Sequence, residues 1–237
     1  MSENEKKQLA IILPSLDPDE KFLAVVDGLI EAGFEKIVIV DDGSCEEKQH
    51  FFTEAEKHPQ TVVLHHEVNK GKGRALKDAF AYVLDKLPEM QGVITIDGDG
   101  QHLTEDIIAC GEKMLELGDK VVLGSRNFDA PGVPNRNGKG NKFTAKMFGV
   151  FFGIKIRDTQ TGLRAIPREY LPLFCEIEGE RFEYETNMLL VMKKRGVDFY
   201  EQSIATVYDP EDYSTHYHPI KDSARVAKIM LKSFSVK

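Results

Sequence analysis

The chain has 237 residues, of which 41% are hydrophobic and 30% charged, and its formal net charge is −8. This length is enough for one large α/β domain or two smaller ones with a sizeable buried core. The acidic balance argues against general nucleic-acid binding, which requires a basic surface. The three cysteines fit no Cys-x-x-Cys pattern, so we expect a reducing compartment without zinc or a disulfide framework.

Neither a signal peptide nor a membrane-spanning helix is predicted. The first eight residues are polar apart from Met1, and no run approaches the ~20 apolar residues of a spanning helix. We therefore expect a soluble chain, one that can still bind a membrane surface or be a fragment cut before a membrane segment.

Short apolar runs alternate with helical patterns over the first half of the chain. The runs predict buried strands at residues 9–13, 37–40, 61–64, 93–96 and 120–124. Helices are expected between them, at about 19–32, 46–57, 74–87 and 104–117. Thr104 is the expected N-cap of the last helix. Alternation of this kind predicts right-handed βαβ units and a mostly parallel sheet.

The pattern changes after Gly124. Residues 127–141 are rich in glycine, asparagine, proline and basic side chains, which predicts a long mobile loop. Residues 142–156 predict an apolar, aromatic helix, which is either a core helix whose lysines reach solvent or an interfacial helix beside a lipid. Further elements are expected as a short helix at 168–174, a helix at 183–195, strand-like segments at 198–200 and 204–208, and a basic amphipathic helix from 219.

The most informative stretch is the turn after the strand at 93–96. It carries Asp97 and Asp99 two residues apart, with Gly98 and Gly100 beside them. Ligands of open α/β sheets bind at the carboxyl ends of the strands, and glycine lets backbone and ligand approach closely. Two carboxylates placed in this way can converge on a divalent cation. We therefore predict a metal that holds a diphosphate here, with a solvated turn as the alternative.

The turns after the first two strands are also polar. Pro14 and Ser15 close the first strand, and Asp41, Asp42 and Gly43 follow the second. In a doubly wound sheet these turns meet the metal turn along one edge. Asp42 could accept a hydrogen bond from a base, or both aspartates could accept from ribose hydroxyls. A plain turn that caps a helix explains them equally well.

Basic residues and glycines follow the third strand. Lys70 and Lys72, each beside a glycine, could contact phosphate. The stretch is no P-loop, because the Gly-x4-Gly-Lys-Ser/Thr order is absent, and it lacks the third glycine of a dinucleotide fingerprint. An EF-hand loop beginning at Asp97 is excluded because its sixth and twelfth positions are His102 and Ile108 rather than Gly and Glu.

Taken together and in order, these motifs resemble a known family. They are Pro14-Ser15, Val40-Asp-Asp-Gly-Ser44, Asn69-Lys-Gly-Lys-Gly73, Asp97-Gly-Asp-Gly-Gln-His102 and Gly124-Ser-Arg126. The set is similar to family 2 glycosyltransferases of the GT-A fold. Asp158-Thr-Gln-Thr-Gly-Leu-Arg164 narrows the resemblance to the dolichyl-phosphate mannose synthase-like, polyprenyl-phosphate group. Phe182-Glu-Tyr-Glu185 and residues 214–222 resemble a bacterial subgroup that is often fused to a small membrane domain.

The resemblance covers about residues 9–235 and implies one Rossmann-like GT-A domain, with a mostly parallel sheet flanked by helices and a C-terminal extension on the acceptor side. Residues 8–125 would be the nucleotide-binding half, 126–218 the sugar and acceptor half, and 219–237 a basic amphipathic helix. That last segment carries five basic residues against one acidic residue. This suits an anionic membrane surface, with a solvated helix face as the alternative.

The resemblance also implies roles for particular residues. The nucleotide-binding residues would be Pro14, Ser15, Asp17, Asp41, Asp42, Gly43, Lys70, Lys72, Asp97 and Gly98. A Mg²⁺ or Mn²⁺ ion would be held by Asp97, Asp99 and Gln101. The cations nearest the donor and acceptor phosphates would be Arg126, Arg136 and Arg164. The sugar and acceptor would be faced by Asp158, Thr161, Gly162, Glu183, Glu185 and His216. Asp17 departs from the family pattern, which has asparagine at that position.

The implied activity is that of an inverting, metal-dependent glycosyltransferase. It would move a sugar from a UDP- or GDP-sugar to polyprenyl (undecaprenyl) phosphate for a cell-wall or surface polymer. An acceptor phosphate is already anionic and needs arginines more than a base, whereas a hydroxyl acceptor would need Asp158 as its base. The rivals are a saccharide or protein hydroxyl acceptor, a sugar-nucleotide pyrophosphorylase and a catalytically silent nucleotide-binding module. We expect a cytoplasmic protein, peripheral at the inner face of the cell membrane, with a membrane-domain partner.

Overall fold

The computed structural model describes residues 1–128 and 135–205, and gives the backbone alone for 135–140 and 143. Its strands are β1 (Leu9–Ser15), β2 (Ile37–Asp41), β3 (Thr61–His65), β4 (Gly92–Thr95), β5 (Val121–Arg126), β6 (Arg164–Pro167) and β7 (Phe199–Ile204). Its helices are α1 (Glu3–Lys6), α2 (Glu20–Glu31), η1 (Glu46–Lys48), α3 (Gln49–Ala55), α4 (Lys72–Lys86), α5 (Thr104–Leu117), α6 (Asn135–Phe152), η2 (Arg168–Tyr170), α7 (Leu171–Cys175) and α8 (Glu183–Arg195).

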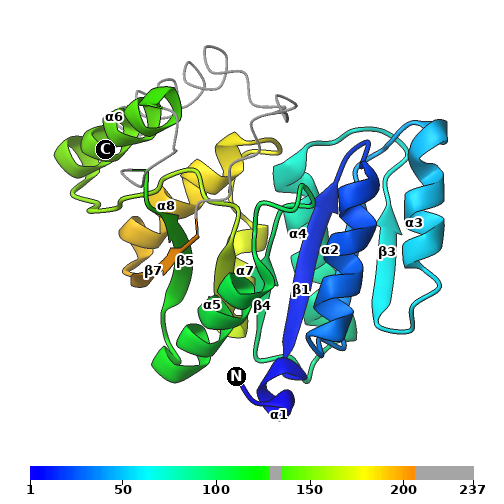
Figure 1. Cartoon of the computed structure of the whole chain (residues 1–237). Helices are drawn as coiled ribbons and strands as arrows, with labels where there is room; N and C mark the ends of the chain where they lie inside the picture. Colours follow the sequence, from blue (N-terminus) through cyan, green and yellow to red (C-terminus); the bar gives the residue numbers. More distant parts are fainter. Residues whose placement is uncertain (129–134, 206–237) are drawn as a thin grey trace.

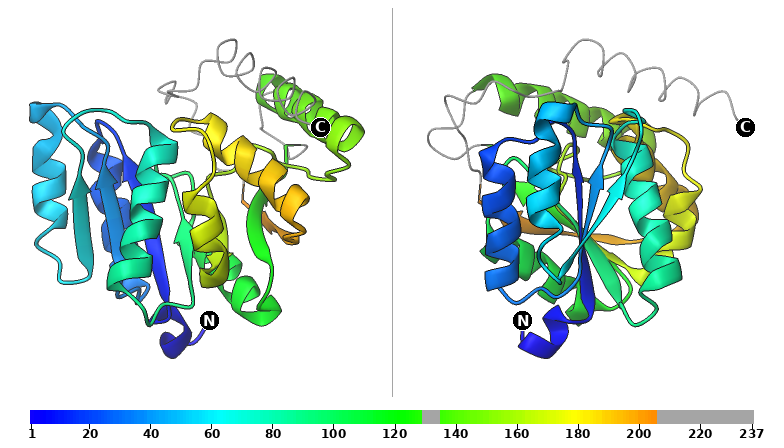
Figure 2. Two further views of the ribbon diagram at one scale, coloured as in Figure 1. Left: turned by 180° about the vertical axis from the view of Figure 1, so that it is seen from behind. Right: turned by 90° about the vertical axis from the view of Figure 1, so that its right-hand side faces the viewer.

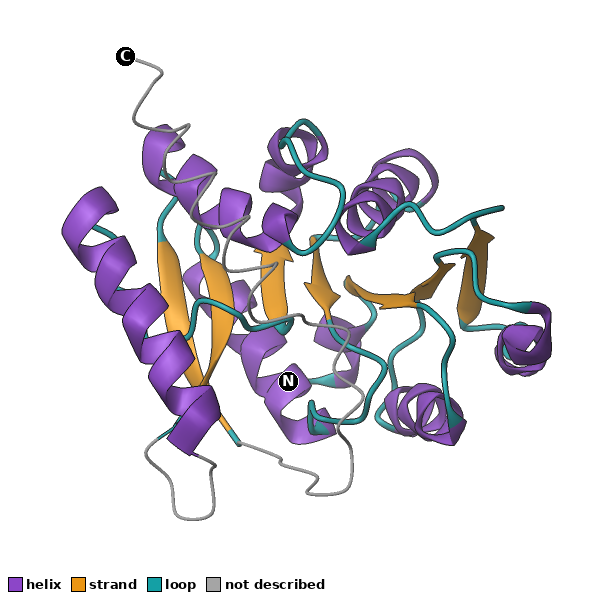
Figure 3. Ribbon diagram, turned by 90° about the horizontal axis from the view of Figure 1, so that it is seen from above, coloured by secondary structure: helices purple, strands orange, loops and turns teal. Residues whose placement is uncertain are grey.

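The described strands form one seven-stranded sheet in the order β3-β2-β1-β4-β6-β5-β7 (Figures 1 and 3). Only β6 runs antiparallel to its neighbours, β4 and β5. The strand order reverses between β1 and β4, which creates the crevice where open α/β sheets bind ligands. The predicted mostly parallel α/β sheet is confirmed, and residues 164–167 of the predicted acceptor half lie inside it.

Helices cover both faces of the sheet, as the turned views show (Figure 2). Side chains alternate along β1, so that Ala10 and Ile12 face one side of the sheet and Leu9, Ile11 and Leu13 the other. The first pair packs with buried residues of α4, α7 and α8, and the other three pack with those of α2, α3 and α5. A strand buried on both faces reads as a continuous apolar run, which is why these strands were predictable.

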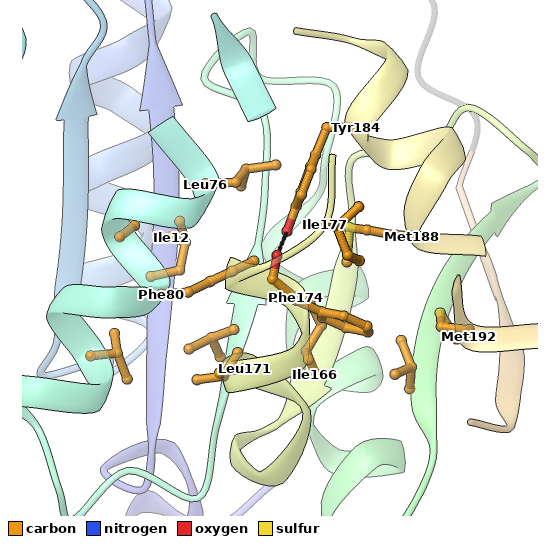
Figure 4. Packing of buried hydrophobic residues seen from close by; sticks show 14 of the residues in the cluster. Ile12, Leu76, Phe80, Ile166, Leu171, Phe174, Ile177, Tyr184, Met188 and Met192 are labelled. Atoms are coloured by element: carbon orange, nitrogen blue, oxygen red, sulfur yellow. Dashed lines mark hydrogen bonds between the residues drawn. The ribbon is translucent and has the colours of Figure 1, made fainter. Parts of the chain in front are cut away.

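The core on the α4 side also holds the second half of the chain in place. Figure 4 shows Phe80 of α4 beside Leu171 and Phe174 of α7, with Tyr184 of α8 above them. The buried hydroxyl of Tyr184 donates a hydrogen bond to the backbone oxygen of Phe174 at 2.8 Å. Helix α8 is therefore fixed to the sheet next to the start of α4, where several predicted site residues lie.

Strand β6 and helix α6 correct the prediction for the second half. Strand β6 was not predicted, because four residues in an antiparallel strand are too few to show a periodicity. The predicted loop at 127–141 is wrong over 135–141, where α6 already runs. Asn141 explains this, since its buried side chain bonds the backbone of Arg157 at 2.6 Å and of Thr159 at 3.0 Å. Tertiary contact thus overrides weak helix propensity.

Smaller corrections concern the ends of elements. Helix α6 ends at Phe152 rather than at residue 156, because Gly153 adopts a positive φ of 64°. Thr104 is the first residue of α5 and not its cap, a position taken by Leu103. The two strand-like segments are one strand, β7, and residues 206–208 and 219–237 lie outside the described residues. Within the described ranges, no helix combines the length and apolar character needed to cross a membrane.

Candidate active site

The polar turns predicted to meet at one sheet edge do lie together. Ser15, at the end of β1, is in register with Asp41 at the end of β2. The turn after β4 reaches the same place, because a β-carbon added to Gly98 would lie 3.8 Å from the hydroxyl oxygen of Ser15. The three turns therefore form one continuous edge around the β1–β4 crevice.

Asp97 is enclosed by three neighbours. Its Oδ1 accepts from the ammonium of Lys72 at 2.7 Å, and its Oδ2 lies 3.3 Å from Nε2 of His102. A β-carbon on Gly162 would lie 2.2 Å from the same Oδ2, so only glycine fits there. Burial alone would raise the pKa of Asp97, but Lys72 and His102 outweigh it and hold the pKa well below its usual range. The charged form of the Asp97 carboxylate is therefore favoured in this arrangement.

Asp99 is in the opposite situation. Its Oδ1 accepts a hydrogen bond from the backbone N–H of Gln101 at 3.0 Å. Burial and the nearby negative charge of Asp97 together raise the pKa of Asp99. A carboxylate whose negative charge is disfavoured in this way gains from a cation placed beside it. Asp99, with the amide oxygen of Gln101, is thus the part of the turn that best fits a hard divalent ion.

Lys72 connects this turn to the second half of the chain. Its ammonium also lies 3.0 Å from Oε1 of Glu185, at the start of α8. Burial opposes its charge, but Asp97 and Glu185 outweigh burial and raise the pKa of Lys72. The cation therefore stays charged between two carboxylates from different halves of the chain.

Asp41 and Asp42 are largely engaged inside the protein. Asp41 accepts from the backbone N–H of Ser44 at 2.8 Å and the side chain of Gln49 at 2.9 Å. Asp42 accepts from the backbone N–H groups of Lys70 at 2.9 Å and Gly71 at 2.7 Å. Both carboxylates therefore organise the loops of this edge. The structure leaves their predicted contact with a nucleoside untested.

Two histidines that the sequence did not single out complete these loops. Nδ1 of His65 lies 3.0 Å from Asp41, and Nδ1 of His66 lies 2.8 Å from Asp42. The other ring nitrogen of His66 lies 3.1 Å from Asp78 on α4. The available signal was their position at the end of the third strand. His65 is the last residue of β3 and lies opposite Asp41 in the β2–β3 register, and His66 follows it.

The glycines around Lys72 allow close packing against other parts of the protein, and the predicted phosphate contact stays a prediction. Gly71 has a φ of 102°, and a β-carbon on it would lie 2.4 Å from the backbone oxygen of Glu180. A β-carbon on Gly73 would lie 2.5 Å from Cβ of Tyr184. Gly43 has a φ of 78°, and a β-carbon on it would lie 2.3 Å from the backbone carbonyl carbon of Val68. These glycines allow the loops to approach each other closely.

Asp17 joins the first two turns. Its backbone N–H donates to the hydroxyl of Ser44, and its carboxylate accepts from the backbone N–H of Cys45, both at 2.8 Å. It also adopts a positive φ of 49°, which aspartate tolerates better than most residues. The departure from the family pattern is thus compatible with an ordered turn. Pro14 lies within β1, opposite Val40.

Arg126 and Asp158, two residues of the predicted acceptor side, form an ion pair. The guanidinium donates to both oxygens of Asp158, at 2.7 and 3.2 Å, and lies over the ring of Phe128. Burial opposes its charge, but Asp158, and to a smaller degree Asp97 and Asp99, raise the pKa of Arg126. The guanidinium of Arg126 is therefore close enough to Asp97 and Asp99 for their negative charges to stabilise it.

A hollow of about 590 Å³ lies beside Arg126, between the ends of β5 and β7 and helix α6. Three cationic side chains line it, from Arg126, Lys142 and Arg157. Apolar atoms of Ala145 and Ile204 complete its walls. The hollow thus combines positive charge with an apolar surface.

The remaining predicted residues lie deeper. Arg164 is 2% exposed and donates to the backbone oxygens of Thr161 and Glu185, so it connects the loop before β6 to the start of α8. Glu183 accepts from the backbone N–H groups of Glu180 and Arg181. Here both side chains order loops, and their predicted contacts with phosphate or sugar stay predictions. The side chain of Arg136, and His216, lie outside the described residues.

Comparison with known proteins agrees with this geometry. The model of the glycosyl transferase family 2 matches residues 11–173. A dolichyl-phosphate N-acetylglucosaminyltransferase from Methanococcus voltae that uses UDP-N-acetylglucosamine is 26% identical over 223 residues, 85% of this chain and 86% of that protein. Mannosyl-3-phosphoglycerate synthase from Rubrobacter xylanophilus superposes with a TM-score of 0.73 at 18% identity, over 98% of this chain and 75% of that one.

A second solved structure adds a ligand set. Glucosyl-3-phosphoglycerate synthase from Mycobacterium tuberculosis, solved with Mn²⁺, UDP and glucosyl-3-phosphoglycerate, has a TM-score of 0.70 at 15% identity, over 97% of this chain and 80% of that one. At such identities these likenesses concern the GT-A fold alone. The family match covers more than half of the chain and agrees with the sheet-edge carboxylates. The chain therefore belongs to glycosyl transferase family 2 and is a transferase enzyme.

Proposed function

We propose that this enzyme transfers a sugar from a nucleoside diphosphate sugar to a polyprenyl phosphate. The observation that carries the proposal is an acidic turn, Asp97 to Asp99, with the half-buried cation of Arg126 near enough to be influenced by its charge. Asp97 and Asp99 suit the metal–diphosphate end of a donor, and Arg126 suits an anionic acceptor. The dolichyl-phosphate substrate named for the Methanococcus voltae relative supports a lipid-linked acceptor.

The donor would bind around the β1–β4 crevice. Asp99 and Gln101 would hold a Mg²⁺ or Mn²⁺ ion, with Asp97 as a third ligand, and the Mn²⁺ and UDP of the mycobacterial neighbour support this choice. Such an ion stabilises the negative charge that develops on the leaving diphosphate. No group of three or more His, Cys, Asp or Glu residues within the described ranges is placed to hold an ion. Donor phosphates would therefore supply further ligands, as is usual for Mg²⁺.

The reaction would be a single displacement. An oxygen of the acceptor phosphate attacks the anomeric carbon as the bond from that carbon to the diphosphate oxygen breaks. The electron pair leaves with the nucleoside diphosphate, and the configuration inverts. Arg126 would position the acceptor phosphate and offset its charge. No proton has to be removed from an acceptor that is already ionised.

Asp158 bears on the choice between a phosphate and a hydroxyl acceptor. A hydroxyl acceptor would need a base to remove its proton, and Asp158 is the predicted base. Its side chain is fully buried and both of its oxygens are occupied by Arg126. A carboxylate held in this way is poorly placed to accept a proton. This arrangement favours the phosphate acceptor over the saccharide or protein hydroxyl.

The test is the destination of the sugar. With a radiolabelled nucleotide sugar, Mn²⁺ and undecaprenyl phosphate in detergent, we expect label to enter the organic phase. Label found only in water-soluble product would contradict the lipid acceptor and favour a small phosphate or hydroxyl acceptor. Pyrophosphate release from a nucleoside triphosphate and a sugar phosphate would instead indicate a pyrophosphorylase.

A substitution tests the metal turn separately. Asp99→Asn removes the charge that a divalent ion needs and keeps the shape of the side chain. We expect Mn²⁺-dependent binding of UDP to weaken at least tenfold, measured by calorimetry, and transfer to be lost. Asp85→Asn, at an exposed aspartate paired with Lys86, is the control. Unchanged Mn²⁺-dependent binding in Asp99→Asn would contradict the metal assignment.

A further inference from the structure

We propose that Lys72 couples donor binding to metal binding, by closing Asp97 in the free enzyme and releasing it when a diphosphate arrives. This inference rests on the proposed function, because it concerns the same metal and donor. It adds an order of events at the site: the ammonium leaves Asp97 for the donor phosphates, and Asp97 then becomes available to the ion.

The two carboxylates of the turn are unequally available to a metal. Both oxygens of Asp97 have partners, Lys72 at 2.7 Å and His102 at 3.3 Å, and Gly162 closes a further side. Asp99 accepts one backbone hydrogen bond. Among the described residues, no side-chain hydrogen bond to Asp99 has to be broken before an ion can bind it. The carboxylate of Asp97 is 33% exposed, but an ion that binds it competes with the ammonium of Lys72 at 2.7 Å.

Lys72 is built to move while its backbone stays in place. It is the first residue of α4, and the preceding N–H of Gly71 is held by Asp42 at 2.7 Å. The four-carbon side chain above this anchor is flexible. A lysine in the first turn of a helix is unfavourable to the helix dipole, and α4 has no acidic residue there. Its position is thus explained by the site better than by the helix.

Glu185 keeps the displaced ammonium from being left without a partner. It lies 3.0 Å from Lys72 on the side of α8, and its own side chain is 11% exposed. A buried lysine that lost its only carboxylate would be strongly destabilising. With Glu185 and a donor phosphate as partners, Lys72 can leave Asp97 and stay paired.

The consequence is a thermodynamic coupling between the two ligands. In the free enzyme Mn²⁺ competes with Lys72 for Asp97. With UDP bound, the phosphates attract Lys72 and the competition ends. By linkage, UDP must strengthen Mn²⁺ binding by the same factor by which Mn²⁺ strengthens UDP binding. Removal of the ammonium should therefore raise the affinity for Mn²⁺ alone and reduce this factor.

The experiment is a calorimetric titration of the whole chain with Mn²⁺, with and without UDP. Lys72→Met keeps the length of the side chain and removes its charge. We expect it to bind Mn²⁺ alone about tenfold more tightly than wild type, a change within the usual range of coupling factors. We also expect the ratio of Mn²⁺ affinities with and without UDP to fall below the wild-type ratio, and the remaining coupling to come from donor phosphates that would ligate the ion. Lys86→Met, at an exposed lysine at the other end of α4, is the control and should match wild type.

A second variant predicts a change of opposite sign, which covers the case that Lys72→Met does not fold. Glu185→Gln leaves Asp97 as the remaining carboxylate partner of Lys72, so Mn²⁺ alone should bind more weakly than to wild type. Wild-type Mn²⁺ affinity and coupling in both variants would overturn the inference and leave the proposed function intact. Failure of wild type to bind Mn²⁺ in the presence of UDP would overturn the metal-dependent function, and the inference with it.

Discussion

At the scale of single residues, the site depends on how closely Gly162 approaches Asp97. A β-carbon at position 162 would lie 2.2 Å from Oδ2 of Asp97, closer than any real contact. Gly162→Ala must therefore push the loop or the carboxylate away. We expect a loss of about 1–3 kcal/mol in the free energy of unfolding and at least tenfold weaker Mn²⁺-dependent UDP binding, measured by urea unfolding and calorimetry.

Gly28→Ala in α2 is the matched control for this substitution. Its β-carbon would lie 3.6 Å from the nearest atom, the hydroxyl of Thr104, which is ordinary contact. Alanine is also the better helix former. We expect unchanged UDP binding and equal or higher stability. If Gly162→Ala behaved like Gly28→Ala, the close approach to Asp97 would not matter for the site.

The pair of His65 and Asp41 predicts a pH dependence of stability. Burial opposes the charged ring, but Asp41 and Glu56 outweigh it and raise the pKa of His65 above 6.5. Since the pKa is higher in the folded state, the stabilisation is complete below the unfolded pKa and is lost as the pH rises through the folded pKa. We expect His65→Asn to be destabilised relative to wild type more at about pH 5.5 than at about pH 9.

Urea unfolding at both pH values measures this effect. His50→Asn is the control, because the ring of His50 contacts the backbone oxygen of Glu47 rather than a carboxylate. Its difference from wild type should be the same at both pH values. An equal difference for His65→Asn would show that the charge of His65 adds nothing to stability.

At the scale of elements, the side chain of Arg168 caps the C-terminal end of α4. Its guanidinium donates to the backbone oxygens of Leu84 at 3.0 Å and Leu87 at 2.8 Å, and the oxygen of Leu87 also accepts from the backbone N–H of Met90 at 3.2 Å. Arg168→Ala removes the guanidinium donor from both oxygens and leaves the oxygen of Leu87 with its bond to Met90. We expect it to cost about 1–3 kcal/mol of unfolding free energy, measured with urea. Lys86→Ala, an exposed change in the same last turn, should stay within about 0.5 kcal/mol of wild type.

The first half of the fold was predictable from the sequence because its signals are local. Strands such as β1 are buried on both faces and read as apolar runs, and polar turns follow them directly. The second half was harder, since α6 depends on the distant contacts of Asn141 and β6 on pairing between β4 and β5.

For the site, the carboxylates of Asp97 and Asp99 could be picked out from the sequence. The difference in their hydrogen-bond partners could not. The distances from Asp97 to Lys72 and His102 follow from packing between distant segments. A motif shows which residue types are present; it does not show which of their hydrogen bonds are already occupied.

At the scale of the whole molecule, helix α6 exposes both lysines and apolar side chains, and Lys142 and Lys146 are the exposed lysines among its described side chains. Residues 135–157 carry six basic residues and no acidic one, in a chain of net charge −8. Phe148 is buried in the core, whereas Val150 is 70% exposed and Phe151 47% exposed. The prediction of a core helix is thus confirmed for the buried side of α6, and an interfacial role of its exposed side stays a prediction. Cations beside exposed apolar side chains suit an anionic membrane surface.

Flotation with vesicles that contain phosphatidylglycerol tests this surface. We expect wild type to bind and the binding to fall as salt rises. The double variant Val150→Asp and Phe151→Asp should bind at least fivefold more weakly, because charge replaces apolar area. Val68→Asp, at an exposed valine elsewhere, should bind like wild type. Equal binding of the double variant would place the membrane contact on another part of the chain.

The antiparallel strand β6 also has a consequence for synthesis of the chain. It fills the space between β4 and β5, which precede it in sequence. Until the ribosome has made residue 167, β4 has an open edge of unpaired backbone groups, and such edges recruit other chains. A fragment that ends at Arg126 should therefore self-associate in light scattering, whereas one that ends at Ala205 should not. Insertion of β6 would then be the step of folding that most needs protection from aggregation.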